Sequence, residues 1–204
     1  MNAAPQSRTY EFQPSFILGF HGCDQSTTEL VLKDGGNKPH LLWSRQAYDW
    51  LGHGIYFWEG NPARAKAWAQ ERHRQGKIKS PSVVGAIIDL RHCLDLFDLQ
   101  NMREVEAAYK GLKRSLRQIG FPLPKNKGNT PDKAARYLDC LVMNFLHQSR
   151  DDDHANPGLK FDSVRGAFLE GKRVYPGAGF RRETHIQICV RNPDCIKGYF
   201  RPIA

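Results

Sequence analysis

Residues 52–58 read GHGIYFW, and residues 20–22, further upstream, read FHG. An apolar segment that begins at Ser15 ends in the histidine–glycine pair, as expected of a strand that runs into a turn. In the second stretch two glycines flank a turn, and the aromatic residues that follow have strand character. Together the two segments predict a pair of strands whose ends bind a flat ligand through hydrogen bonds and an aromatic face.

A helix is predicted directly after these strands, over Pro62–Gln75. Asn61 can cap it, Pro62 suits its first turn, and Gly76 follows its end. One face of this helix carries small and aromatic side chains: Ala65, Trp68 and Ala69. The next segment, Val83–Leu90, is a nearly continuous apolar run, so we expect a strand that is buried on both faces.

The middle of the chain has helical spacing. Apolar residues recur at helical intervals over Arg103–Ile119, with lysine and arginine between them. Gly120–Asn129 reads as a loop, and a second amphipathic helix is expected from Thr130 onward. Arg150–Gly158 is polar and reads as a turn region. We interpret residues of about 100–150 as a helical insertion beside the sheet.

Strand patterns return at the C-terminal end. Phe161–Leu169 and Thr184–Val190 read as strands, separated by a Gly/Pro-containing loop over Gly171–Arg182. A turn at Asn192–Asp194 precedes a last strand, Cys195–Phe200. Because strands lie at both ends and helices between them, we expect an α+β fold rather than a doubly wound sheet.

Bulk composition indicates one globular domain, residues 1–204. Hydrophobic residues make up 40% and charged residues 25%, which excludes a disordered chain. No apolar run approaches the roughly 20 residues that a membrane-spanning helix needs. Met1–Arg8 lacks the apolar core of a signal peptide. We therefore expect a cytoplasmic protein with no membrane partner.

Net charge and the pattern of cysteines restrict the kinds of partner and site that the sequence supports. The net charge of +9 attracts phosphate-bearing partners, nucleic acid above all. The alternatives are a solvated basic surface and an acidic protein partner. Five cysteines occur without a CxxC pair, which argues against a zinc site and a disulfide framework. Neither GxGxxG nor GxxxxGK[ST] is present, so the common nucleotide-binding motifs are unsupported.

The order of the motifs resembles the nicotinamide pocket of ADP-ribosyltransferases of the diphtheria-toxin and poly(ADP-ribose) polymerase branch, which carry a His-Tyr-Glu signature on three strands. The resemblance implies a split antiparallel β-sheet core with flanking helices, and NAD as co-substrate without a metal. His21 would contact the adenosine-side ribose, and the Gly22 backbone would bind the carboxamide. Gly54, Tyr56 and Phe57 match the second motif, with Tyr56 stacking on nicotinamide.

The third signature position departs from the family. Counting back along the C-terminal strand places Gln187 where the resemblance implies a glutamate. Glutamine can hydrogen-bond a ribose hydroxyl but brings no negative charge to a developing cation. Glu183 shares a strand face with Gln187, and Glu170 begins the preceding loop, so either could restore the charge. This departure favours single transfer over polymer synthesis.

The loop between Phe168 and Glu183 corresponds to the family's target-recognition loop. Basic and aromatic side chains are interleaved there, as suits phosphate contact and base stacking. The predicted target-binding residues are Tyr175, Phe180, Arg181 and Arg182.

The sequence thus leads to a mono-ADP-ribosyltransferase that modifies a macromolecule, with RNA favoured over DNA and protein side chains second. The resemblance also implies a bacterial toxin or anti-phage effector with a neutralising antitoxin protein. The alternatives are a non-catalytic reader of NAD or ADP-ribose, a plain NAD hydrolase, and an RNA-processing enzyme that removes a 2′-phosphate. Tyr56 counts against the last, which would need a basic or histidine residue there.

Overall fold

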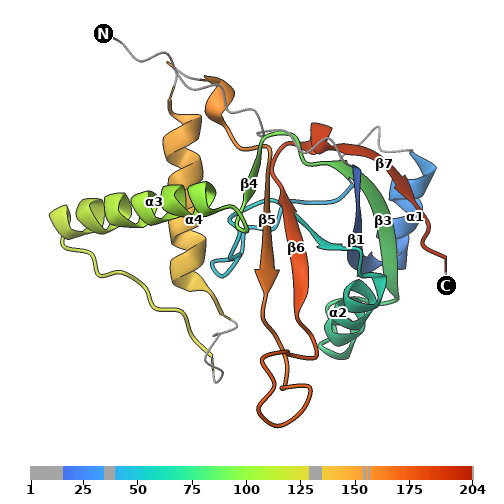
Figure 1. Cartoon of the computed structure of the whole chain (residues 1–204). Helices are drawn as coiled ribbons and strands as arrows, with labels where there is room; N and C mark the ends of the chain where they lie inside the picture. The colour runs from blue at the N-terminus through green and yellow to red at the C-terminus, as the bar shows by residue number, and fades with distance from the viewer. Residues whose placement is uncertain (1–15, 35–39, 129–134, 154, 156, 204) are drawn as a thin grey trace.

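In the computed structural model of the chain, a sheet of seven strands dominates the described residues, which are 16–34, 40–128, 135–153, 155 and 157–203. The strands are β1 (Phe16–Asp24), β2 (Ile55–Glu59), β3 (Pro81–Asp89), β4 (Cys93–Asp95), β5 (Ser163–Phe168), β6 (His185–Val190) and β7 (Ile196–Phe200). Their order in the sheet is β4-β5-β6-β2-β1-β3-β7 (Figure 1). Neighbouring strands are antiparallel except for β4 and β5, which are parallel.

Four α-helices accompany the sheet within the described residues. They are α1 (Gln25–Lys33), α2 (Pro62–Arg74), α3 (Leu99–Gln118) and α4 (Tyr137–Asp151), and two short 3-10 helices span Pro157–Leu159 and Pro193–Cys195. The predicted α+β class is therefore confirmed. None of these helices combines the length and apolar character that crossing a membrane requires, as far as the described residues extend.

Local chemistry explains α2, whose predicted bounds are confirmed to within one residue. The side chain of Asn61 accepts a hydrogen bond from the Arg64 N–H, and Pro62 occupies the first turn. The helix lies against β1 and β3 (Figure 1). Ala65 is fully buried there, in contact with an aromatic cluster that includes Phe20 and Trp58.

Strand β1 pairs with its two neighbours over very different lengths. It pairs with β3 along its whole length, from Phe16 to Asp24. With β2 it pairs only at Gly19 and Phe20. Beyond Phe20 the two strands separate, so the sheet opens at the histidine–glycine pair that ends the first motif.

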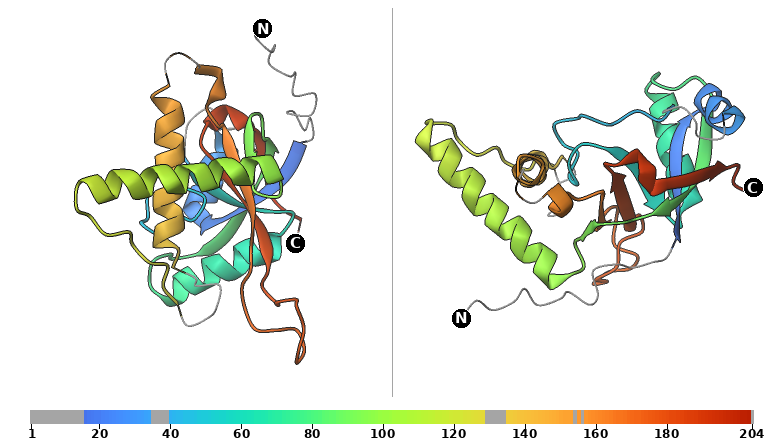
Figure 2. Two further views of the ribbon diagram at one scale, coloured as in Figure 1. Left: turned by 60° about the vertical axis from the view of Figure 1, so that its left-hand side comes forward. Right: turned by 90° about the horizontal axis from the view of Figure 1, so that it is seen from above.

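Side-chain alternation divides the sheet into two faces. Phe57 and Ile188 belong to the core on the face covered by α1. Tyr56, on the other face, packs with the cluster beneath α3 and α4. The α3–α4 pair occupies the segment expected to be an insertion, and α3 extends away from the sheet (Figure 2).

Several expectations need correction. The helix expected from Arg103 begins at Leu99, because the Asp98 side chain accepts from two backbone N–H groups of the first turn. The polar segment after Arg150 is partly helical, since α4 continues to Asp151. Strand β3 is not buried on both faces, because Ile87 is 36% exposed. Helix α1 and the short strand β4 were not predicted, and the expected helix start at Thr130 lies outside the described residues.

Candidate functional site

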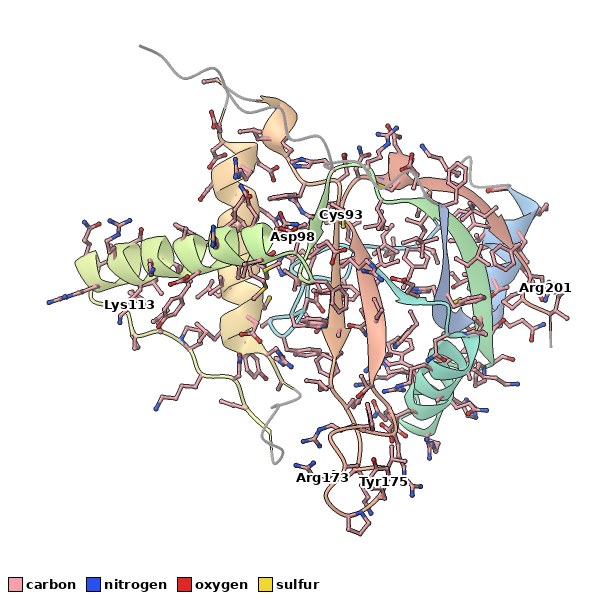
Figure 3. The ribbon with its side chains drawn as sticks, viewed as in Figure 1. Cys93, Asp98, Lys113, Arg173, Tyr175 and Arg201 are labelled. Carbon is pink, nitrogen blue, oxygen red and sulfur yellow. The ribbon has the colours of Figure 1, made fainter. Side chains whose placement is uncertain are left out.

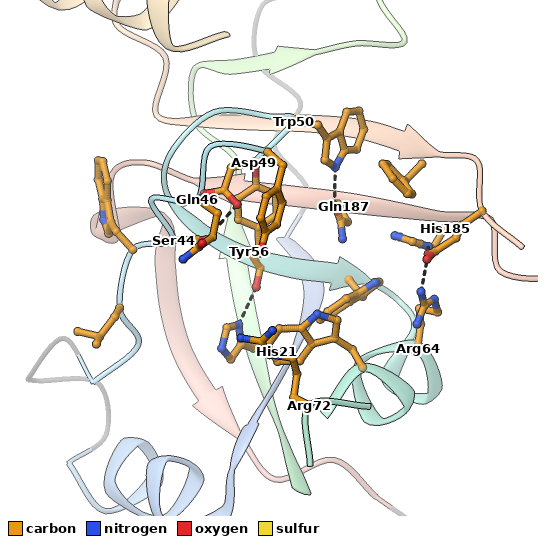
Figure 4. Close-up of a pocket in the computed structure, with 17 residues that line it drawn as sticks. His21, Ser44, Gln46, Asp49, Trp50, Tyr56, Arg64, Arg72, His185 and Gln187 are labelled. Carbon is orange, nitrogen blue, oxygen red and sulfur yellow. Dashed lines mark hydrogen bonds and ion pairs between the residues drawn. The ribbon is translucent and has the colours of Figure 1, made fainter. Parts of the chain in front are cut away.

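A cleft of about 420 Å³ opens on the face of the sheet where β1 and β2 separate. This volume lies in the range of small-molecule sites. Its walls come from β1, β2, β6, α2 and the loop that precedes β2 (Figure 4). The side chains with polar groups that line it are His21, Trp43, Ser44, Gln46, Tyr48, Asp49, Trp50, Tyr56, Trp58, Arg64, Trp68, Arg72, Glu170, His185 and Gln187.

His21 bridges the opening between the two strands. Its Nδ1 lies 2.7 Å from the carbonyl oxygen of Tyr56. Because a carbonyl only accepts, Nδ1 carries the proton. Burial lowers the pKa of His21, against the raising effect of this hydrogen bond, so the ring is neutral near pH 7. Nε2 is then an unprotonated acceptor on a residue that lines the cleft.

Tyr56 contributes its ring to the cleft, while its hydroxyl is engaged elsewhere. The hydroxyl donates to the Gly52 carbonyl at 2.8 Å and accepts from the Leu51 N–H at 3.1 Å. Burial raises the pKa of Tyr56 well above its ordinary value. The phenol therefore stays protonated and fixes the turn before β2, so its hydroxyl is not a general base at neutral pH.

The amide of Gln187 is oriented by a neighbour. Trp50 Nε1 donates to Gln187 Oε1 at 2.6 Å. The amide nitrogen points away from the indole (Figure 4). Gln187 therefore offers the cleft a hydrogen-bond donor, whereas a carboxylate at this position would offer an acceptor.

The two carboxylates considered at sequence level occupy different positions. Glu170 lines the cleft and forms an ion pair with Arg64 of α2. Glu183 does not line it; its side chain is 54% exposed and lies 4.0 Å from the same guanidinium. Glu170 is thus the one of the two candidates that faces the cleft.

His185 lies two positions before Gln187 on β6 and lines the same cleft. Its Nδ1 donates to the Glu183 carbonyl at 2.6 Å and lies 3.8 Å from the Glu170 carboxylate. Burial lowers the pKa of His185. Its Nε2, together with Trp58 Nε1 and Arg64 Nε, is buried and has no hydrogen-bond partner among the described residues.

Another carboxylate that lines the cleft, Asp49, is buried and was not identified from the sequence. It accepts hydrogen bonds from the Ser44 hydroxyl at 3.0 Å and from the Gln46 N–H at 2.7 Å. Burial raises its pKa, against the lowering effect of these bonds. The loop that contains Asp49 has no periodic sequence pattern. The spacing between Ser44 and Asp49 is the one local feature of the sequence that points to this hydrogen bond.

The glycines of the two motifs allow close packing. A Cβ atom at Gly22 would lie 2.3 Å from the carbonyl oxygen of Ala65 in α2. One at Gly54 would lie 2.5 Å from the sulfur of Cys189. Both positions therefore admit only glycine without a shift of the neighbouring backbone or side chain.

Besides Glu183, the predicted cofactor-binding residues Gly22, Gly54 and Phe57 and the predicted target-binding residues do not line the cleft. Phe57 is fully buried in the core on the opposite face, with its ring 5.7 Å from that of His21. The predicted target-binding residues lie on the loop between β5 and β6, which projects from the sheet (Figure 1). There Tyr175 is 57% and Phe180 71% exposed, and Arg181 donates to the Gly171 carbonyl.

The chain is similar to an uncharacterized protein of the archaeon Methanocaldococcus jannaschii. The two are 25% identical over 195 residues, which cover 87% of this chain and 83% of that protein. No protein-family model matches the chain, and no solved structure matches it. Function is therefore inferred from the cleft itself.

The described part of the chain holds no group of three His, Cys, Asp or Glu side chains arranged to bind a metal ion. Of the described cysteines, Cys189 is fully buried, and burial raises its thiol pKa above the ordinary range. It is a small core residue, as its strand pattern predicts.

Proposed function

We propose that the cleft binds NAD and that the protein transfers one ADP-ribose to a macromolecule, with release of nicotinamide. One observation carries this proposal. His21, Tyr56 and Gln187, chosen from three separate sequence segments, line one cleft at the point where β1 and β2 separate. Their convergence supports the resemblance to ADP-ribosyltransferases and the split-sheet fold that it implies.

The polar groups at the opening suit the two polar ends of the expected ligand. His21 Nε2 is an acceptor for a ribose hydroxyl. The N–H of Gly60 donates to the Leu18 carbonyl, so Leu18 directs its backbone groups toward β2. The direction of the backbone groups repeats every two residues along a strand, so the N–H and C=O of Gly22 point to the same side as those of Leu18. Gly22 lies beyond Phe20, the last residue of β1 that pairs with β2. A carboxamide could pair with both groups.

Tyr56 supplies a flat surface beside these groups. Its hydroxyl is held by the Gly52 carbonyl and the Leu51 N–H, so the ring is fixed before any ligand binds. A fixed aromatic ring suits stacking on nicotinamide, because little side-chain entropy is lost on binding.

In NAD the nicotinamide is joined to ribose as a pyridinium cation; cleavage of this bond would release neutral nicotinamide and leave the positive charge on the sugar. A site for this reaction needs negative charge near the ribose. Gln187 offers only an amide donor, whereas Glu170 and Asp49 are carboxylates that line the cleft. We assign Glu170 the role of stabilising the cation, with Arg64 holding it in position.

The acceptor in this proposal is a nucleic acid, with RNA ahead of DNA and protein side chains as the alternative. The net charge of +9 and the exposed aromatic side chains of Tyr175 and Phe180 favour nucleic acid. A cytoplasmic toxin or anti-phage effector with a neutralising antitoxin fits this activity, as the resemblance implies.

A second candidate is a reader that binds NAD or ADP-ribose without catalysis. It is favoured by Gln187, whose amide brings no negative charge to the cleft and whose oxygen already accepts a hydrogen bond from Trp50. A reader would bind the ligand and release no nicotinamide.

Labelled NAD incubated with RNA, DNA or a protein extract distinguishes these functions. Label fixed on RNA and lost with His21→Ala or Tyr56→Ala would support the transferase, and Tyr56→Phe is the matched control that keeps the ring. Nicotinamide release without fixed label would indicate a hydrolase. Binding without release would indicate the reader, and no binding of NAD would contradict the proposal.

A further inference from the structure

The C-terminal half of α3 carries a stripe of positive charge that takes no part in the cleft. Lys110, Lys113, Arg114 and Arg117 follow the spacing i, i+3, i+4 and i+7, so they share one face of the helix. The other face, which contains Ala108 and Leu112, packs on α4. The stripe is about 10 Å long at the helical rise of roughly 1.5 Å per residue. We call these four residues the basic stripe.

Much of the protein's excess charge lies in this region. Residues 107–128 contain six basic side chains and no acidic one, in a chain whose net charge is +9. Lys110 forms an ion pair with Glu106 in the preceding turn. Lys113, Arg114 and Arg117 are exposed and form no ion pair with any described residue. Within the described part of the chain, these three charges are therefore not neutralised by an acidic side chain.

Large apolar side chains are exposed beside the stripe. Ile119 and Phe121, which follow the end of α3, are each 66% exposed. Gly120 between them has a φ of 72°, which ends the helix. Figure 1 shows this end of α3 far from the sheet, and Figure 3 marks Lys113 near it, well away from Arg173 and Tyr175 on the β5–β6 loop.

We propose that the basic stripe and Phe121 bind single-stranded nucleic acid. Cations along one helix face match the phosphates of a strand, and an exposed aromatic ring offers a stacking surface for a base. Single strands are favoured over duplexes because their bases are free to stack. This surface is separate from the cleft, and its binding requires no NAD.

The test uses the full-length protein and fluorescently labelled RNA, DNA and duplex oligonucleotides of about 20 nucleotides, without NAD. A triple variant, Lys113→Gln with Arg114→Gln and Arg117→Gln, removes three charges of the stripe. The matched control, Lys66→Gln with Arg74→Gln and Lys77→Gln, removes three exposed charges in and after α2. Circular dichroism and urea unfolding establish that both variants fold.

We expect the stripe variant to bind single strands at least about tenfold more weakly, and the control less than about threefold. The slope of log K against log salt concentration should become shallower by about 2 in the stripe variant, because three phosphate contacts are lost. Phe121→Ala weakens binding about tenfold with an unchanged slope, because stacking releases no counterions. The variant Phe121→Ala also serves if the triple variant does not fold.

Three results would overturn the inference. One is equal loss of affinity in the two triple variants, which would assign binding to the overall charge. Another is tighter binding of duplex than of single strands by the unaltered protein. The third is no binding of any oligonucleotide. Because NAD is absent throughout, none of these results bears on the proposed cleft chemistry.

Discussion

Trp50 Nε1 donates a 2.6 Å hydrogen bond to Oε1 of Gln187, so an indole from the loop before β2 determines which end of this amide faces the cleft. The Trp50 side chain is itself held in the cluster beneath α3 and α4. Helices α3 and α4 thus support the orientation of Gln187 through Trp50.

Gln187→Glu is predicted to increase nicotinamide release. One carboxylate oxygen would keep the bond from Trp50, and the other would bring negative charge to the cleft. We expect an increase on the order of tenfold or more, since an aligned charge in a partly buried site stabilises a developing cation. Nicotinamide release is measured by chromatography, with Gln187→Leu as control. Equal or lower release from Gln187→Glu would show that this position does not face the reacting ribose.

Glu170→Gln is predicted to lower nicotinamide release by about tenfold or more, because it removes a carboxylate that lines the cleft. Glu183→Gln is the matched control, because the Glu183 side chain is 54% exposed and lies outside the cleft. Exposed charges are screened by solvent and salt, so we expect less than a twofold change in this variant. The two variants are compared by initial rates at saturating NAD. Similar losses in both would argue that the loop, and not the Glu170 carboxylate, is required.

Gly22→Ala is predicted to reduce the free energy of unfolding by about 1–3 kcal/mol, as overpacking does. The added Cβ would lie 2.3 Å from the Ala65 carbonyl, so α2 must move away from β1. That shift would also displace Arg64 and weaken NAD binding. Gly198→Ala in β7 is the control, since nothing lies within 4 Å of its Cβ position. Urea unfolding that gives equal stabilities for the two variants would contradict the close packing at Gly22.

His147 is predicted to make stability depend on pH. Burial, reinforced by the charge of Arg191, lowers its pKa from 6.5 to about 3 in the folded protein. The unfolded chain therefore binds a proton between these values and the folded protein does not. The stabilisation is complete above about pH 6.5 and decreases toward pH 3, by at most about 1.4 kcal/mol per pH unit.

The free energy of unfolding should decrease between pH 7 and pH 5 in the unaltered protein. In His147→Leu this decrease should be smaller by about 2 kcal/mol. Urea unfolding at both pH values measures the difference. Burial also lowers the pKa of His21 and of His185, so a residual dependence on pH remains in the variant. The exposed His73→Gln is the control, and an unchanged pH dependence in His147→Leu would show that His147 is not protected from protonation.

Local chemistry determined which elements could be predicted. Asn61 and Pro62 define the start of α2 within a few residues, and the structure agrees. Helix α1 was missed because its capping residue, Asp24, also ends β1 and is fixed by N–H groups of Lys79 and Ser80, far away in the sequence. Such non-local hydrogen bonds leave no periodic pattern in the sequence.

The same difference between local motifs and contacts that leave no sequence pattern applies to the residues of the cleft. His21 and Tyr56 could be chosen because each belongs to a short motif beside a glycine. Phe57 follows Tyr56 directly, so strand alternation turns it to the core face, and its assignment to the cofactor site ignored that period of two. Trp50 lies on an irregular loop and acquires its position through contacts with distant elements, such as Gln187. Asp49, on the same loop, is held by the Ser44 hydroxyl and the Gln46 N–H, and this local turn has no periodic sequence pattern.

The loop between β5 and β6 is predicted to select the acceptor and to take no part in the cleavage of NAD. Tyr175 and Phe180 are exposed on it and do not line the cleft. The double variant Tyr175→Ala with Phe180→Ala should therefore lower transfer to RNA at least about tenfold, given the stacking energy of two aromatic rings. Nicotinamide release without an acceptor should stay within about twofold.

Transfer and release are measured on the same preparation with doubly labelled NAD. Leu169→Ala, an exposed apolar residue just before the loop, controls for general surface effects. A parallel fall in transfer and release would mean that the loop shapes the cleft, and an unchanged transfer would mean that the acceptor binds elsewhere.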